Sequence, residues 1–222
     1  MIAKTLINRT IPPLKPSDDG TKALAWMSNF HVQHLPVVHH HQYLGLVSEY
    51  DILDRNTPIQ AFDRYELDKT NQPFVTENTH LYVILKTVIE NHLTLVPVLD
   101  EQQRYVGAIT IENLLEHFAR ASSLQEPGGI IQLEMPAHRY ALSEIAQIVE
   151  SNGAKVLSAN VVSNPDESRV EVTIKINRTE LDSILATFER YNYDVMATHG
   201  EDTFASEVQD NYDALFNYLN MQ

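Results

Sequence analysis

The sequence contains no cysteine among its 222 residues. This absence excludes disulfide bonds, thiolate metal sites and cysteine nucleophiles together. The sequence also lacks the run of about 18 to 20 apolar residues that a membrane-spanning helix needs. Its first ten residues have no continuous apolar core of the kind found in signal peptides. We therefore expect a soluble cytoplasmic protein that does not associate with membranes.

Basic residues are also scarce, with 16 Lys and Arg against 30 Asp and Glu, which gives a net charge of −14. Residues 1–122 carry 10 basic and 14 acidic side chains, whereas residues 123–222 carry 6 and 16. Nucleic-acid binding depends on Lys and Arg that neutralise the phosphate backbone, and an acidic surface repels it. We expect no nucleic-acid partner.

Motifs that would indicate catalysis are missing as well. The sequence has no Gly-x-x-x-x-Gly-Lys phosphate loop, no Gly-x-Gly-x-x-Gly and no Gly-x-Ser-x-Gly nucleophile elbow. Three consecutive histidines at residues 39–41 fall in a predicted hairpin turn, where exposed polar residues are more common than metal ligands. We predict a protein that is not an enzyme, with no metal site and no required cofactor.

An internal repeat is the strongest positive feature. Leu-Pro-Val-Val at residues 35–38 recurs as Val-Pro-Val-Leu at 96–99, and residues 43–51 recur at 105–113. The offset is 61 in the first case and 62 in the second, and Leu14 aligns with Val75 at the offset of 61. The agreement extends over roughly fifty residues per copy, about 8–58 and about 70–122.

Each copy has the same predicted order of elements, β-α-β-β-α. A short extended segment leads to a polar helix cap, Ser17 and Asp18 in copy one and Asn78 and Thr79 in copy two. An amphipathic helix follows, and the Pro-Val segment ends it because proline lacks a backbone donor. Two strands joined by a polar turn and a second helix complete the copy.

The doubled pattern Pro-Val-Val and Gly-Leu-Val-Ser-x-x-Asp resembles a tandem pair of cystathionine-β-synthase (CBS) domains over residues 1–122. The resemblance implies a compact module with two clefts between the repeats. In that family the clefts commonly hold adenine nucleotides such as AMP, ATP or S-adenosylmethionine, and some pairs bind nothing. It also implies a set of ligand-binding residues, which are Pro12, Pro36, Val37, Ser48, Asp51, Pro97, Val98, Thr110 and Asn113.

The residues themselves support one cleft more than the other. Ser48 and Asp51 lie three apart across a predicted strand-to-helix junction, where free amides suit a phosphate and a carboxylate can accept ribose hydroxyl protons. The alternative interpretation is structural, with Ser48 as a helix cap and Asp51 as a first-turn acid. In copy two Thr110 keeps the hydroxyl, but Asn113 replaces the acid. We expect the Asp51 cleft to be the occupied one.

Few basic residues are available near the clefts to bind phosphate. Their scarcity favours AMP or S-adenosylmethionine over ATP. The candidates are Lys4, Arg9, Lys15, Lys22, Arg55, Arg104 and Arg120.

The carboxy-terminal half reads as a second domain after a linker at residues 123–129. Residues 130–199 show the order βαββαβ of a ferredoxin-like sandwich, with Asn177 predicted to cap the second helix and Glu180 as its capping-box partner. This order resembles an ACT domain, an amino-acid-sensing regulatory module. The turn at residues 135–140 lacks the glycine of that family's Asp-x-Pro-Gly motif, which favours a pairing role over amino-acid binding. Residues 200–222 are predicted to form an acidic amphipathic helix.

The sequence as a whole predicts an α+β protein, a CBS pair followed by an ACT-like domain, similar to the bacterial acetoin-utilisation accessory proteins. The predicted function is that of a homodimeric regulatory sensor that binds an adenine nucleotide and modulates a partner enzyme. The alternatives are a ligand-free dimeric scaffold, an amino-acid sensor acting through the ACT-like domain, and an enzyme.

Overall fold

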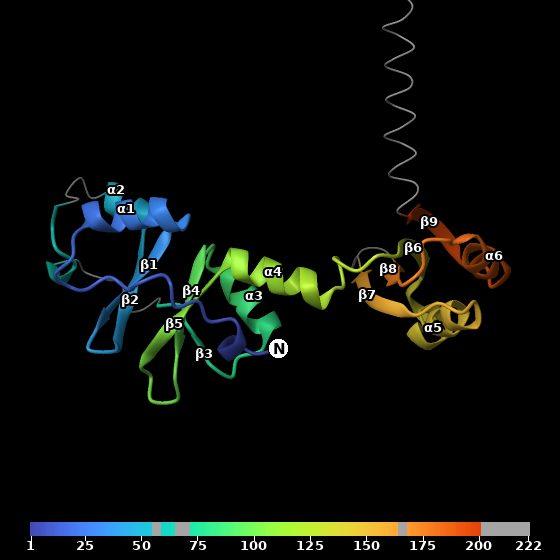
Figure 1. Ribbon diagram of the computed structural model, residues 1–222, viewed down its shortest axis with the longest axis horizontal. Helices are drawn as coiled ribbons and strands as arrows, with labels where there is room; N and C mark the ends of the chain where they lie inside the picture. The colour runs from blue at the N-terminus through green and yellow to red at the C-terminus, as the bar shows by residue number, and fades with distance from the viewer. Residues whose placement is uncertain (55–58, 65–71, 164–167, 201–222) are drawn as a thin grey trace, which may run out of the picture. The chain divides into compact units, whose positions relative to one another are not determined.

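The computed structural model describes residues 1–54, 59–64, 72–163 and 168–200. The chain divides into two compact units, Met1–Phe118 and Ala119–Gln222 (Figure 1). Apart from Gly200, the helix predicted over residues 200–222 lies outside the described residues. No helix in the described part of the chain has the length and apolar character required to cross a membrane.

The first unit contains both copies of the repeat. Copy one consists of α1 (Gly20–Phe30), the hairpin β1 (His34–His39) and β2 (Gln42–Ser48), and α2 (Glu49–Asp54). Copy two consists of β3 (Val75–Thr76), α3 (Leu81–Glu90), β4 (Leu95–Leu99), β5 (Tyr105–Thr110) and α4 (Ile111–Ala121). Two 3₁₀ turns, Ala3–Thr5 and Phe62–Arg64, complete the unit. The predicted mixed α+β fold of two matching repeats is confirmed.

The repeat is visible in the backbone pairing. Leu14 forms a parallel bridge with Val37, and Val75 pairs in parallel with Val98 at the same offset of 61. Both hairpins carry a register shift at corresponding positions, one after Val37 and the other after Val98. The alignment made from the sequence therefore matches the three-dimensional equivalence of the copies.

Residues that correspond under the repeat also meet each other. The backbone N–H of Gln33 donates to Thr94 Oγ1 at 2.8 Å, and Gln42 bridges Arg104. Contact between equivalent positions is what a two-fold axis between the copies produces. The apolar cores join across this axis, because Leu95 and Ala108 of copy two belong to the buried cluster of copy one.

The helix caps differ from the prediction by one residue. Asp19, not Ser17 or Asp18, caps α1 by accepting from Lys22 N at 2.9 Å. Asp18 instead accepts from Lys15 N and from Lys22 Nζ. In copy two His80 takes the capping position of α3, since Thr79 Oγ1 is bonded to Thr76. Several polar residues precede each helix, and turn hydrogen bonds outside the helix decide which of them is free to cap it.

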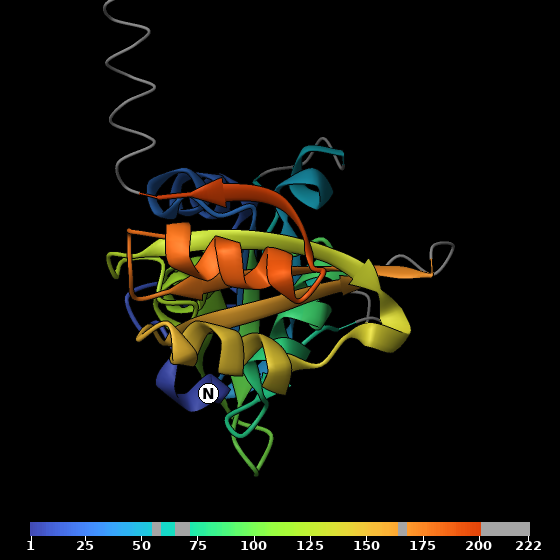
Figure 2. The ribbon, with the colours of Figure 1, turned by 90° about the vertical axis from the view of Figure 1, so that its right-hand side faces the viewer.

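The second unit is a four-stranded antiparallel sheet with two helices on one face (Figures 1 and 2). Its strands lie in the order β7-β8-β6-β9, which is that of a ferredoxin-like βαββαβ sandwich. The elements are β6 (Gly129–Pro136), a 3₁₀ turn (Ala137–Arg139), α5 (Leu142–Ser151), β7 (Val156–Ser163), β8 (Arg169–Ile176), α6 (Asp182–Arg190) and β9 (Asp194–His199).

The alternation of buried and more exposed residues along the strands shows which face of the sheet belongs to the core of this unit. Every second residue of β6 is buried, and these side chains pack with the apolar faces of both helices. The predicted cap of the second helix is wrong, because α6 begins at Asp182 and has no side-chain cap. Asn177 instead accepts from Lys155 N at 2.7 Å, which joins the end of β8 to the start of β7.

Candidate functional site

The junction between β2 and α2 is closed by a reciprocal pair of polar side chains. The Ser48 hydroxyl donates to Asp51 Oδ2 at 2.6 Å and accepts from the Asp51 backbone N–H at 3.0 Å. Asp51 Oδ2 also accepts from the Ser48 backbone N–H at 3.0 Å. This is the geometry of a capping box with aspartate as the acid. Asp51 Oδ1 makes no hydrogen bond within the described residues and remains available to a ligand.

The amides at this helix start are already engaged. Asp51 N–H is bonded to Ser48, and Glu49 N–H donates to Gln33 O at 2.8 Å. Phosphate binding at a helix start requires N–H groups that have no other acceptor. The free amides assumed from the sequence are thus largely occupied.

The corresponding junction between β5 and α4 shares two of these three hydrogen bonds. The Thr110 hydroxyl donates to Asn113 Oδ1 at 2.9 Å and accepts from Asn113 N–H at 3.1 Å. Ile111 N–H donates to Thr94 O, as Glu49 N–H does to Gln33 O. Asp51 and Asn113 therefore share a structural role, and any difference in binding must come from charge and surroundings.

Two adjoining cavities open around the copy-one junction, and His34 and Ser48 line both. The first, of about 360 Å³, contains Asp51 and is lined from copy two by residues at the end of α3 and just after it. Its described lining is His34, Leu46, Ser48, Asp51, Pro73, Glu90, Asn91, His92 and Leu93. The second, of about 340 Å³, is lined by Gln33, His34, Ser48, Glu49, Tyr50 and Leu53. The first cavity is thus assembled from both copies.

His34 connects the two copies at the wall of these cavities. Its Nδ1 accepts from the Thr94 backbone N–H at 3.3 Å and lies 3.0 Å from Thr94 Oγ1. Burial lowers the pKa of His34 below its ordinary value, although the nearby Asp51 carboxylate opposes this shift. A neutral ring that accepts at Nδ1 carries its proton on Nε2. His34 therefore offers a hydrogen-bond donor without a positive charge.

The other predicted binding residues lie deeper in the fold. Pro36 and Val37 are buried in β1, and the Pro36 carbonyl accepts from Leu14 N at 2.8 Å. Pro97 and Val98 occupy the equivalent buried positions in β4. Pro12 is half-buried ahead of α1. None of these five is among the described residues that line the two cavities.

The predicted cations also lie away from the described cavity walls. Lys22 pairs with Asp18 at 2.7 Å and sits over the Trp26 ring, and Arg104 pairs with Asp100 at 2.7 Å. Arg55 lies outside the described residues. The described lining of both cavities contains no Lys or Arg. Nor do the described residues include any cluster of three or more His, Cys, Asp or Glu that could hold a metal.

Glu90, Asn91 and His92 were not identified from the sequence as site residues. They lie about forty positions from Asp51 in the chain, and the packing of copy two against copy one brings them to the cavity. The offset of the repeat could have indicated this region, because Gln33 and Thr94 are equivalent and meet at the axis.

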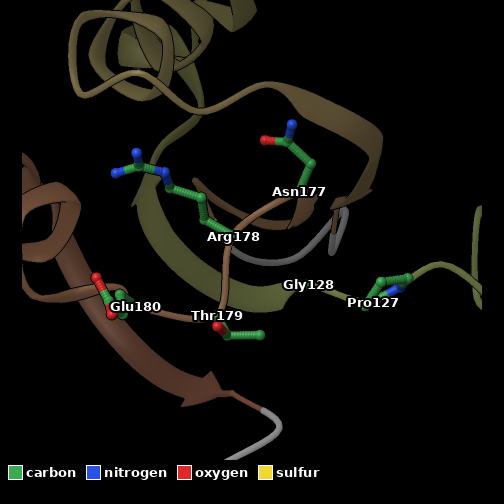
Figure 3. Close-up of a pocket in the computed structure, with 6 residues that line it drawn as sticks. All are labelled: Pro127, Gly128, Asn177, Arg178, Thr179 and Glu180. Atoms are coloured by element: carbon green, nitrogen blue, oxygen red, sulfur yellow. The ribbon is translucent and has the colours of Figure 1, made fainter.

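A further pocket of about 480 Å³ lies in the second unit, at the amino-terminal end of β6 (Figure 3). It is lined by Pro127, Gly128, Asn177, Arg178, Thr179 and Glu180. The side chains of Asn177 and Arg178 extend in different directions, so its polar groups do not converge on one point. The turn at residues 135–140, where the ACT resemblance places an amino-acid site, follows the opposite end of β6.

Comparison with known proteins matches residues 3–56 and 65–120 to the family model described as CBS domain. Among solved structures, a CBS domain pair/ACT domain protein from Thermotoga maritima is 24% identical, with a TM-score of 0.47 over 55% of this chain and 98% of that one. CBSX2 in complex with AMP is 21% identical, with a TM-score of 0.45 over 54% and 96%. The CBS domain of a bacterial CNNM/CorC family Mg²⁺ transporter in complex with ATP is 18% identical, with a TM-score of 0.43 over 54% and 87%.

Proposed function

Since the chain belongs to the CBS-domain family, with a tandem pair of these domains in residues 3–120, we propose that it is a non-catalytic sensor of an adenine nucleotide or related adenosine compound. The ligand occupies the copy-one cleft and is of the AMP, ATP or S-adenosylmethionine type. The observation that carries the proposal is the Asp51 carboxylate, whose Oδ1 makes no hydrogen bond to any described residue and which lines a cavity built from both copies.

The chemistry of this cleft suits a ribose. Asp51 Oδ2 is held by Ser48, so the carboxylate is fixed in orientation before a ligand arrives. Oδ1 can then accept hydroxyl protons of the sugar, and such charge-assisted hydrogen bonds are about twice as strong as neutral ones. His34 Nε2 supplies a donor from the neighbouring wall. Ser48, Asp51 and His34 form the proposed binding set, with Thr110 and Asn113 as a weaker second set.

The position of the cleft suggests how binding becomes regulation. Because residues of both copies line the cavity, a ligand there stabilises one arrangement of the copies over others. We propose that this bias is passed to a partner enzyme, and that the chain acts as a homodimer. We further propose that residues 130–199, whose strand order is that of a ferredoxin-like sandwich, act as an ACT-like pairing domain, as in a protein similar to the acetoin-utilisation accessory proteins.

Calorimetric titration of the parent chain with AMP, ATP and S-adenosylmethionine tests this proposal. We expect at least one of them to bind, and Asp51→Ala to weaken that binding by tenfold or more, on the order of one charged hydrogen bond. Asn113→Ala is the matched control, because it removes the same capping role without removing a charge. Equal losses in both variants, or no binding by the parent, would contradict the proposal.

A ligand-free scaffold remains the second candidate, and one observation favours it. Both junctions are closed by a hydroxyl that donates to the side chain three residues ahead and accepts from its backbone N–H, so Ser48 and Asp51 have a sufficient structural role without any ligand. A scaffold predicts that none of the compounds raises the melting temperature, whereas a sensor is stabilised by its ligand through mass action.

A further inference from the structure

The described lining of the copy-one cleft includes three carboxylates. Asp51 of copy one and Glu90 of copy two both line the first cavity, and Glu49 lines the adjoining cavity. The described lining provides no Lys or Arg to balance them. Lys86 lies nearby, with its Nζ 3.7 Å from Glu90 Oε1, but its side chain is 72% exposed and the contact is screened by water.

At the β2–α2 junction the groups that could serve as phosphate donors are engaged with other protein groups, and His34 and His92 are the imidazoles in the described lining. The Ser48 hydroxyl proton goes to Asp51, and the Glu49 and Asp51 amides donate to Gln33 O and Ser48 Oγ. His34 accepts at Nδ1 from Thr94, so its ring is a neutral donor and not a cation. A phosphate in this cleft would meet Asp51 and Glu90, with no Lys or Arg in the described lining to balance them.

The size of the cavity keeps a bound group close to both carboxylates. A volume of about 360 Å³ corresponds to a sphere roughly 9 Å across, which is smaller than the Debye length of about 10 Å at 0.1 M salt. A phosphate inside it therefore lies within reach of both Asp51 and Glu90, although water at these exposed side chains weakens the repulsion.

We propose that the copy-one cleft selects adenosine compounds whose 5′ substituent is neutral or positively charged, and discriminates against those that carry phosphate. This selectivity rests on the proposed function and names the ligand class of the same site. Asp51 binds the ribose, and Glu90 is the specificity-determining residue, repelling phosphate and favouring a cationic group such as a sulfonium. A like charge at this range weakens binding on the order of tenfold.

Titration calorimetry of the full chain with adenosine, S-adenosylmethionine, AMP and ATP, without added Mg²⁺, tests the selectivity. At low ionic strength we expect adenosine and S-adenosylmethionine to bind about tenfold or more tightly than AMP, and ATP to bind weakest. In about 1 M salt, where the Debye length is about 3 Å, the gap between adenosine and AMP should narrow.

The variant Glu90→Gln separates charge from shape. Glu90→Gln should raise the affinity for AMP by about threefold and leave the affinity for adenosine unchanged. The factor is modest because the Glu90 side chain is partly solvated. Glu101→Gln is the control, since it removes one charge in the β4–β5 turn, at the opposite end of the strands from the cleft. If AMP binds as tightly as adenosine, or if Glu90→Gln and Glu101→Gln change the affinity for AMP equally, the proposed selectivity is wrong. If none of the four compounds binds, the proposed function itself fails, and the selectivity fails with it.

Discussion

The two copies of the repeat share a backbone and a capping device but differ in what surrounds it. In copy one, His34 is the first residue of β1 and lines both cavities, whereas its equivalent Leu95, the first residue of β4, is fully buried in the core. Ser48 is half-buried, whereas Thr110 is only 6% exposed. One junction thus lines a polar cleft with carboxylates in its described walls, whereas the hydroxyl of the other junction is buried. The Ser/Thr-x-x-Asp/Asn signature therefore forms a helix start in both copies, while the neighbouring residues set the exposure and the charge around it.

The largest expected effect is on the free energy of unfolding, and it compares the packing of the equivalent residues Leu95 and His34. Leu95→Ala opens a cavity in the shared core and should lower the free energy of unfolding by about 2–5 kcal/mol. His34→Ala removes a half-buried ring with hydrogen bonds to Thr94, and should cost about 1 kcal/mol. Urea denaturation of both variants measures this. Similar costs at the two positions would show that the copies are packed alike.

The second comparison concerns the caps themselves. Ser48→Ala and Thr110→Ala each remove a hydroxyl that accepts a helix amide, and each should cost about 0.5–2 kcal/mol. The same denaturation series gives the values, with Thr110→Ser as the control for the lost methyl group. A cost at one junction alone would overturn their structural equivalence.

The third comparison uses the equivalent tyrosines Tyr43 and Tyr105, whose pKa values burial raises above the ordinary range. Tyr43 donates to Pro73 O at 3.3 Å, but the Tyr105 hydroxyl finds no hydrogen-bond partner in the part of the chain that the structure describes. Tyr43→Phe should therefore cost about 1 kcal/mol, and Tyr105→Phe should be neutral or stabilising. Melting temperatures of the two variants suffice, and a marked loss in Tyr105→Phe would contradict this assignment.

The smallest expected effect is on the pH dependence of the protein's stability. Because the folded-state pKa of His34 lies below its ordinary value of 6.5, the unfolded chain takes up a proton that the folded chain resists. Stability should therefore fall as the pH drops below about 6.5, and level off below the folded-state pKa. Other titrating groups contribute too, so the test is the difference between the parent and His34→Gln. A shallower pH dependence is expected in the variant, and an unchanged one would show that His34 does not contribute.

The repeat and the element order could be predicted because they leave local patterns. The offset that pairs Leu14 with Val75 in sequence also pairs their strands in space, and alternation along β8 shows directly in its burial. The caps of α1 and α3 lie one residue beyond the predicted positions, since turns such as the one between Thr76 and Thr79 compete for the same side chains, and α6 has no side-chain cap.

Only part of the cleft could be predicted from the sequence. Ser48 and Asp51 lie close in sequence, and their spacing is a local signal. Glu90 and His92 come to the cavity through packing between the copies, which no local periodicity encodes. The neutral state of His34 likewise depends on burial and on Thr94, sixty positions away.

Backbone amide shifts recorded by NMR during titration with adenosine test the central claim most directly, because they report both copies in one experiment. The account predicts the largest changes at residues 48–53, at Gln33 and His34, and at residues 90–93, with little change around Thr110 and Asn113. Equal changes at both junctions, or changes confined to Thr110 and Asn113, would contradict it.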